Sequence, residues 1–563
     1  MAVPLFLFAA GVVPFLNPIH TDPLPGFYSE WLAAALGLAI AAAALVRSAR
    51  SRTLPVPYLA LLPAMLIGAA LAQLASGHAA HPDAALMYIH YLLLAILLAI
   101  AGRCFAGSSA GPGHLPWLPA GFAAGASVQA AVILLQRGGV PWAWLHSPWV
   151  TGTWTGGALG QRNHLVDYLW LGIASIGYLT ARGTLKIPFA TGLVIAIAAA
   201  SVMAGSRSAF LYPIALAVLA ILAARRDRSR HRWRAVAALL ALTIPAMLAV
   251  DRMVVPSTAE GRRDATATER LAARELDPVR SGLLQVAWQA MRERPLAGYG
   301  VGSAQAVTFD HADTWPPQAS PVVAEHFHNL FAQWFVEFGA PVALLAIGVL
   351  AWWGLGAVRS ASGPEPWWLL MVLAIVGLHS LLEYPLWFAY FLVPAAIAGG
   401  ALGSGGTNLP VGRRHRVFAW LVLLADVVIL GGLWYDYKRL ERAAAATRPG
   451  SPPVMVEYGI DEALSLSHNS LLAPQAIVAA AAAMGVSRQG AEDKWRICER
   501  ALRVSRGADV TAKCGAIGIL ANNRTASHLW SRSAYVYGEH RTRAALTQQG
   551  WGIEGENELF LHK

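Results

Sequence analysis

The sequence predicts an all-α protein, built as a polytopic membrane helix bundle of about 12–13 spans. Of its 563 residues, 56% are hydrophobic and 13% are charged, which is about half the charged fraction of a typical soluble domain. The mean hydropathy is +0.47. Apolar stretches of about twenty residues, the length that crosses a bilayer as a helix, recur along most of the chain. A soluble helix would need a charged face, and these stretches carry none.

Thirteen segments are candidate spans. The first, MAVPLFLFAAGVVPFL, has no basic region and no small-residue cleavage site, so we expect a spanning helix and not a removed signal. An odd number of spans places the two termini on opposite sides of the membrane. The approximate spans are 2–17, 29–47, 57–75, 86–103, 116–136, 164–181, 187–204, 209–224, 234–251, 331–356, 366–382, 384–402 and 417–435.

Basic residues divide unevenly between the short loops on the two sides. One side holds only Arg137, Arg162 and Arg207. The other side holds sixteen basic residues: Arg47, Arg50, Arg52, Arg103, Arg182, Lys186, the six arginines of ARRDRSRHRWR, Arg359, Arg413, Arg414 and Arg416. Loops rich in Lys and Arg stay in the cytoplasm, so we expect the N-terminus inside and the C-terminal tail outside. The net charge of +11 therefore orients helices, and we expect no nucleic-acid partner.

This topology divides the chain into four parts. We expect an N-terminal transmembrane bundle at 1–251, a large periplasmic loop at 252–330, C-terminal transmembrane helices at 331–435 and a periplasmic tail at 436–563. The tail segments ERAAAA, APQAIVAAAAAM and EDKWRICERALRV favour helices, so the tail should be a small helical domain. Its cysteines, Cys498 and Cys514, could form a disulfide in an oxidising compartment or remain two buried thiols.

Four polar clusters fall on the predicted outer side. The first is GQRNHLVDYLW, where Gln161, Arg162, Asn163 and His164 gather at the entrance of the sixth span. Such a group could bind a polar substrate. The alternative is structural: Asn163 would cap the helix while Arg162 extends to the membrane interface.

The second cluster is GSRSAF, a short outer turn that contains Arg207. Positive charge on the outer side departs from the topology rule, so a compensating anion is expected. A phosphate or diphosphate headgroup would supply it. An arginine that pairs with membrane lipid is the alternative.

The third cluster runs from Arg280, at the start of an amphipathic segment, to HFHN at the tenth span. The sequence GYGVGS between them predicts a tight turn and not a nucleotide site, because no strand–helix unit surrounds it. His326 and His328 flank one aromatic residue, but carboxylate ligands are missing from the pattern, so we expect no metal. Asn329 leads into the span, and Glu337 lies inside its apolar run, where a carboxyl group needs a cavity or a partner.

The fourth cluster is HSLLEYPLWFAYF. His379 and Glu383 are four residues apart and should share a helix face, and Pro385 should break the helix there. Tyr384 could bind substrate or belong to the aromatic belt at the interface. The chain has neither a Walker loop nor a GxSxG motif, so its chemistry should use an already activated donor and no cofactor.

In this order, the four clusters resemble the O-antigen ligase/polymerase superfamily and, more narrowly, the bacterial protein O-oligosaccharyltransferases. GQRNHL and HSLLEYPLWFAYFLVP match motifs of that subfamily, and HNLFAQWFVEFG resembles the superfamily signature at the end of the large loop. The matches span roughly residues 1–440. Two features depart from the pattern: His326 and Phe327 precede His328, where a small neighbour is expected, and the tail has no obvious repeats.

The resemblance implies a metal-independent, inverting glycosyltransferase of the bacterial inner membrane with its active site facing the periplasm. It would move a preassembled glycan from undecaprenyl diphosphate to Ser or Thr hydroxyls of a periplasmic protein such as a pilin. Arg207 and Arg280 would bind the diphosphate, and His328 would activate the acceptor. The substrate site would include Gln161, Arg162, Asn163, His164, Asn329, Glu337, His379, Glu383 and Tyr384.

Two other acceptors fit the same residues. An O-antigen ligase would use a lipid A–core sugar, and a polymerase would use the growing glycan. Both need the same arginines, so these cannot discriminate between the acceptors, whereas GQRNHL, LEYPLW and the outer tail favour a protein. A secondary transporter would show inverted repeats and ionisable groups near the midplane, but here the polar clusters gather at one face.

Overall fold

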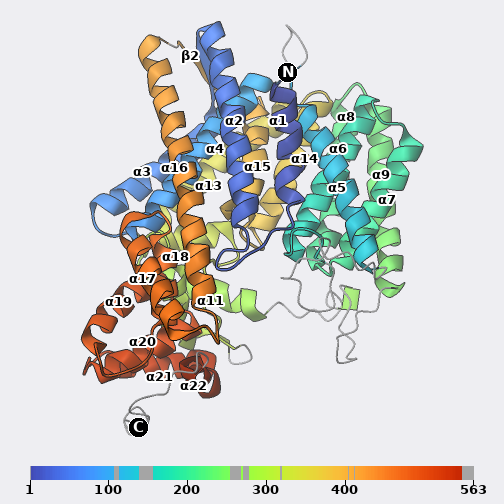
Figure 1. The fold of residues 1–563 in the computed structure, drawn as a ribbon. Helices are drawn as coiled ribbons and strands as arrows, with labels where there is room; N and C mark the ends of the chain where they lie inside the picture. Colours follow the sequence, from blue (N-terminus) through green and yellow to red (C-terminus); the bar gives the residue numbers. More distant parts are fainter. Residues whose placement is uncertain are drawn as a thin grey trace.

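The computed structural model confirms the all-α class (Figure 1). It describes residues 2–106, 113–137, 156–253, 268–269, 278–316, 320–403, 405–410 and 412–547. Each of the thirteen segments that hydropathy predicts as a span contains an α-helix. The predicted division into four parts remains a prediction, because residues 254–267, 270–277 and 548–563 lie outside the described residues.

The membrane bundle takes its helices from both halves of the chain. In order, they are α1 (Ala2–Ala10), α2 (Phe27–Ser51), α3 (Leu61–Ala75), α4 (Pro82–Phe105), α5 (Trp117–Arg137), α6 (Arg162–Arg182), α7 (Ile187–Met203), α8 (Leu211–Arg226), α9 (Arg230–Met253), α13 (Leu330–Ser360), α14 (Pro364–Ser380), α15 (Ala389–Ala401) and α16 (Arg413–Ala446). Short 3-10 helices adjoin them: η1 (Val13–Phe15), η2 (Tyr58–Ala60), η4 (Arg207–Phe210) and η6 (Pro385–Trp387).

Within the described residues, eight helical segments are long and apolar enough to cross a membrane by themselves. They lie in α2, α3 with η2, α4, α5, α8 with η4, α9, α13 and α16. Their outward faces are apolar: on α16, for example, Phe418, Leu424 and Val428 are all exposed. The chain is therefore a multi-pass membrane protein.

Helix α6 is the interior helix of the N-terminal half. It packs against α5, α7, α9 and α14, and every residue from His164 to Tyr178 is buried. Because its neighbours separate it from lipid, α6 can carry polar side chains that an outward-facing span could not. The first polar cluster lies at the start of this helix.

The arginine-rich loops meet at one end of the bundle. There β1 (Thr53–Pro57) and β2 (Gly406–Pro410) form a short antiparallel pair in which Thr53 lies opposite Pro410. At the same end, Arg226 donates to the Val358 carbonyl and Arg232 to the Ala181 carbonyl. Figure 1 shows α1 beginning at this end and the tail helices at the opposite end.

Helix α16 runs from the last predicted span into the segment predicted as the tail. Helix α16 continues to Ala446, so ERAAAA forms its last turns and not a separate tail helix. The tail consists of α17 (Pro453–Asn469), α18 (Ala473–Ala483), α19 (Ala491–Val504), α20 (Ala508–Leu520), α21 (Ala526–Tyr537) and α22 (Glu539–Thr547). Consecutive tail helices pack against each other. A disulfide joins Cys498 to Cys514, which decides between the two alternatives for these cysteines.

The large loop contributes α11 (Pro278–Glu293), α12 (Ala304–Asp310) and η5 (Ala312–Thr314). Leu283 and Val286 of α11 belong to one core cluster with Val336 of α13. The predicted tight turn GYGVGS is confirmed: Gly300 has φ +92°, and a Cβ there would lie 2.3 Å from the His78 carbonyl oxygen. The tail packs onto this loop, with Arg532 2.6 Å from the Asp313 carboxylate.

Candidate active site

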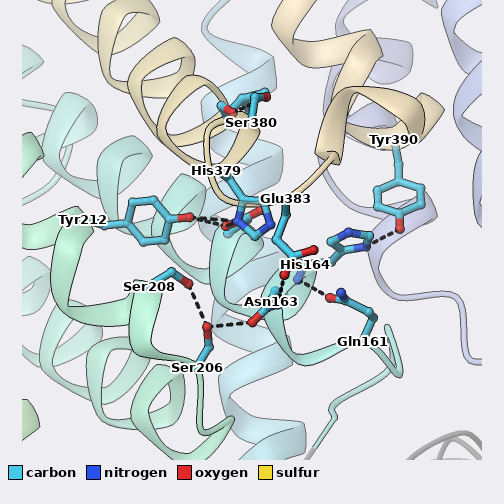
Figure 2. A network of polar contacts seen from close by, with 12 residues as sticks. Gln161, Asn163, His164, Ser206, Ser208, Tyr212, His379, Ser380, Glu383 and Tyr390 are labelled. Carbon is cyan, nitrogen blue, oxygen red and sulfur yellow. Dashed lines mark hydrogen bonds and ion pairs between the residues drawn. The ribbon is translucent and has the colours of Figure 1, made fainter. Parts of the chain in front are cut away.

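The Glu383 carboxylate joins three polar clusters that are far apart in the sequence. Arg280 Nη2 donates to its Oε1 at 3.0 Å, and Asn163 Nδ2 donates to the same oxygen at 3.1 Å. His328 Nδ1 lies 2.9 Å from Oε2, although this contact is not aligned as a hydrogen bond. Figure 2 shows the contact with Asn163. The loop, α6 and the start of α13 therefore converge on one carboxylate.

Helix geometry delivers Glu383 to this place. Helix α14 ends at Ser380, yet the Glu383 N–H still donates to the His379 carbonyl at 2.7 Å, so one more helical turn is kept. Pro385 then starts η6, which confirms the predicted helix break. The carboxylate thus projects from the end of α14 toward the loop.

The electrostatic environment keeps Glu383 ionised. Burial raises the pKa of its carboxyl group, but the neighbouring His328 imidazole and then the Arg280 guanidinium group outweigh burial and hold the pKa at about 2. A carboxylate that is ionised at neutral pH can neutralise Arg280 and lies beside the His328 imidazole.

His328 is held in an unusual backbone conformation. Its φ is +51°, in the left-handed region that few residues other than glycine occupy. The next residue, Asn329, caps α13 by accepting from the Phe331 and Ala332 N–H groups, and it donates to the Leu381 carbonyl at 3.2 Å. Backbone strain of this kind concentrates at functional sites, where the surrounding contacts maintain it.

Aromatic rings close one side of the site. The Tyr384 ring lies 5.3 Å from the His328 ring and 4.2 Å from the His326 ring, and His326 also contacts Trp387. Burial, with a smaller contribution from the charge of His328, lowers the pKa of His326 to about 3, so this imidazole is neutral at pH 7. Burial and then nearby carboxylates raise the pKa of Tyr384 to about 12, which keeps its hydroxyl protonated.

The first and second clusters meet through Asn163. Gln161, and not Asn163, caps α6: its side chain accepts from the His164 N–H at 2.6 Å. The alternative that assigned this cap to Asn163 is therefore wrong. Asn163 instead accepts from Ser206 Oγ at 2.7 Å, as Figure 2 shows. Arg207 follows Ser206 directly, so its segment adjoins the site, and Arg162 is exposed at the start of α6.

Two predicted substrate residues are buried in contacts with other helices. His379 is 1% exposed, and its Nδ1 lies 2.8 Å from Asp167 and 3.1 Å from the Tyr212 hydroxyl. His164 Nδ1 contacts the Tyr390 hydroxyl at 2.7 Å. These contacts join transmembrane helices to each other, and they give no support to a direct role in substrate binding.

Glu337, which the resemblance assigns to the substrate site, is hydrogen-bonded to groups of the protein itself. Its carboxylate accepts from Gln333 Nε2 at 2.9 Å and from the Gly302 N–H at 3.0 Å, and it is 3% exposed. The structure thus satisfies this buried carboxyl group within the protein, where it holds the GYGVGS turn against α13.

The sequence-based set of site residues omits Asp167, Ser206 and Tyr212. Asp167 lies in an apolar run, and a carboxyl group inside a span is a signal of function or of a polar partner. Ser206 and Tyr212 carry no such signal, because serine and tyrosine are ordinary residues at the ends of spans.

Known proteins resemble this chain in both halves. Residues 192–347 match the family model described as O-Antigen ligase. Residues 367–549 match the model described as Virulence factor membrane-bound polymerase, C-terminal. A general O-oligosaccharyltransferase from Acinetobacter baylyi is 24% identical over 445 residues, which cover 75% of this chain and 73% of that protein.

A multi-pass helical fold with these matches defines a membrane-bound glycosyltransferase. Both halves of the chain are similar to the O-antigen ligase/polymerase superfamily, and the predicted resemblance to bacterial O-oligosaccharyltransferases is confirmed. The first matched range contains Arg207, Arg280 and His328, and the second contains Glu383 and Tyr384.

Proposed function

We propose that this protein transfers a preassembled glycan from undecaprenyl diphosphate to Ser or Thr hydroxyls of periplasmic proteins. The observation that carries the proposal is the convergence of Arg280, His328 and Asn163 on the Glu383 carboxylate. In this arrangement a guanidinium group can bind a phosphate leaving group, and an imidazole can accept the proton of an acceptor hydroxyl.

The site faces the periplasm of the bacterial inner membrane in this proposal. The arginine-rich loops, which the positive-inside rule assigns to the cytoplasm, lie at the end of the bundle opposite the tail. The Cys498–Cys514 disulfide in the tail supports the same assignment, because such bonds persist in oxidising compartments.

Arg280 and Arg207 bind the donor diphosphate. As the glycan leaves, negative charge develops on the diphosphate oxygens, and fixed guanidinium groups stabilise that charge more in the transition state than in the ground state. Before the donor binds, Glu383 compensates the charge of Arg280 at 3.0 Å. The donor's phosphate oxygens then supply a second set of acceptors for the same guanidinium group.

His328 activates the acceptor hydroxyl. The neutral imidazole takes the hydroxyl proton on Nε2, and the ionised Glu383 carboxylate beside Nδ1 stabilises the positive charge that results. The acceptor oxygen bonds to the anomeric carbon while the bond from that carbon to the diphosphate oxygen breaks. Undecaprenyl diphosphate leaves, the proton remains on His328, and one displacement inverts the anomeric configuration.

A protein acceptor is favoured over the alternatives by two features. The relative from Acinetobacter baylyi is named as a general O-oligosaccharyltransferase, and GQRNHL and LEYPLW resemble the protein-glycosylating branch. An O-antigen ligase acting on lipid A–core, or a polymerase acting on the glycan, would use the same donor site, so the acceptor must be tested directly.

The test uses the purified full-length protein in lipid nanodiscs with an undecaprenyl-diphosphate glycan. Three acceptors are offered separately: a pilin-derived peptide with its serine, the same peptide with Ala in place of that serine, and lipid A–core. We expect glycan on the serine peptide alone, measured by mass spectrometry. Glycan on lipid A–core alone, or on no acceptor, would contradict the proposed function.

A further inference from the structure

Three buried polar residues lie one helical turn away from residues of the site. Asp167 is four residues after Asn163 on α6, and Tyr212 of α8 is four residues after Ser208 of the adjoining η4. His379 is four residues before Glu383, and the helical turn between them is kept. On α6 and on the α-helical turn that follows α14, residues four apart lie on one face of the helix. Figure 2 shows Tyr212 and His379 meeting beside Glu383 and the serines of the second cluster.

These three side chains bind each other. Asp167 Oδ1 accepts from the Tyr212 hydroxyl at 2.5 Å and lies 2.8 Å from His379 Nδ1, and the Tyr212 hydroxyl is 3.1 Å from the same nitrogen. None is more than 1% exposed. The cluster therefore fixes α6, α8 and α14 to one another within four residues of Asn163, Ser208 and Glu383.

This cluster is a poor device for stability alone. Among the residues that the structure describes, Asp167 Oδ2 and His379 Nε2 are buried without a hydrogen-bond partner. Unsatisfied buried polar atoms cost free energy, and a buried ion pair often contributes less than apolar side chains of the same volume. The polar contacts instead fix the distances and relative orientations of the ends of α6, α8 and α14.

We infer that Asp167, Tyr212 and His379 form a positioning cluster for glycan transfer. It sets the distance between the segment that carries Arg207 and the segment that carries Glu383. These residues touch neither donor nor acceptor. The inference rests on the proposed function, because the two segments are taken to hold the donor diphosphate and the catalytic histidine.

The test measures transfer by Tyr212→Phe, which removes one oxygen atom, and by Asp167→Asn, which keeps the size of the side chain. A displacement of about 1 Å in a reacting group lowers rates by as much as about a hundredfold. We expect turnover at saturating donor to fall at least about tenfold, with the donor KM within about threefold of the wild-type value. The residues act as one unit, so the effects of the two substitutions should not add. The turnover of the double variant should therefore lie within about twofold of that of the slower single variant.

The matched control is Ser175→Ala. It removes the 3.0 Å hydrogen bond from Trp368 Nε1, which joins the same two helices, α6 and α14, at a place farther from the site. This control should keep its turnover within about twofold of the wild type, while thermal unfolding reports any loss of stability in all variants.

Unchanged turnover in both Tyr212→Phe and Asp167→Asn would overturn the inference and leave the proposed function intact. Turnover that falls equally in Ser175→Ala, in step with its stability, would also overturn it. The assay uses whichever acceptor the wild-type protein glycosylates, so a different acceptor would revise the proposed function without changing this comparison.

Discussion

Arg280 reaches Glu383 from the first turn of α11, and its side chain is 31% exposed. It is thus open to an incoming anion while a carboxylate holds it in place. An arginine in this position can exchange one set of oxygen acceptors for another without moving far. In the proposed donor site, Arg280 exchanges the Glu383 carboxylate for the phosphate oxygens of the donor.

Arg280→Ala should weaken use of the donor. Loss of one charge-stabilising donor raises a reaction barrier by about 3 kcal/mol, or roughly a hundredfold in rate. The measurement is kcat/KM for the lipid-linked glycan at fixed acceptor. Arg292→Ala, on the same helix but outside the site, serves as the control and should retain its activity. Equal activity in the two variants would reject the assigned role of Arg280.

Glu383 also predicts how stability depends on pH. Its pKa falls from the ordinary 4.5 to about 2 in the folded protein. The stabilisation is therefore fully present above about pH 4.5 and is lost as the pH falls toward 2, because the unfolded chain binds the proton first. The wild type should have a higher thermal unfolding midpoint than Glu383→Gln. The difference between the two midpoints should be constant above pH 5 and should shrink as the pH falls from about 4.5 toward 2. A difference that does not change with pH would contradict the lowered pKa.

At the scale of elements, hydropathy predicts where helices lie but not which of them are interior. The buried helix α6 carries His164, Asp167 and Tyr168 because protein surrounds it, and only packing reveals this. Helix α16 continues beyond the predicted span because its last turns are rich in alanine, which favours helix. Hydropathy does not detect these turns, since they lie outside the apolar segment. The pair of β1 and β2 was not predicted, since both strands are short and contain proline.

The sequence predicted the polar clusters of the candidate site but not the contacts between them. The four clusters were visible as polar residues near span ends, yet Asn163 and Glu383 are separated by 220 positions and Arg280 and Glu383 by 103. Contacts over such separations depend on how helices pack, which no local pattern encodes. For the same reason, the sequence could not predict that His379 contacts Asp167 or that Glu337 accepts from Gly302.

The GYGVGS turn is an element whose stability can be tested. Gly300→Ala would place a Cβ 2.3 Å from the His78 carbonyl oxygen at φ +92°, a conformation that costs a residue with a side chain about 1–2 kcal/mol before any steric clash. We expect a lower thermal unfolding midpoint than in the wild type. Gly348→Ala, with nothing within 4 Å of the added atom, is the control. Equal midpoints in both variants would contradict this description of the turn.

In the whole molecule, the proposed function requires that the tail and the site share the oxidising side of the membrane. Protein prepared from intact cells in the presence of a thiol-alkylating reagent should carry the Cys498–Cys514 bond, and neither cysteine should react until a reductant is added. Closing a loop of this length stabilises a fold by about 3 kcal/mol, so the Cys498→Ser variant should expose the tail to protease. Cys104→Ser is the control. Full alkylation of both tail cysteines without reductant would place the tail in the cytoplasm.

The most direct test of the account is the rate of glycan transfer by Glu383→Gln. The variant keeps the shape of the side chain but loses the charge that neutralises Arg280 and stabilises a protonated His328. Since a positioned acid–base group contributes about a hundredfold or more, the account predicts a fall of that size at saturating donor and acceptor, with the fold retained. A variant that transfers glycan at the wild-type rate would contradict the claim that this carboxylate organises the active site.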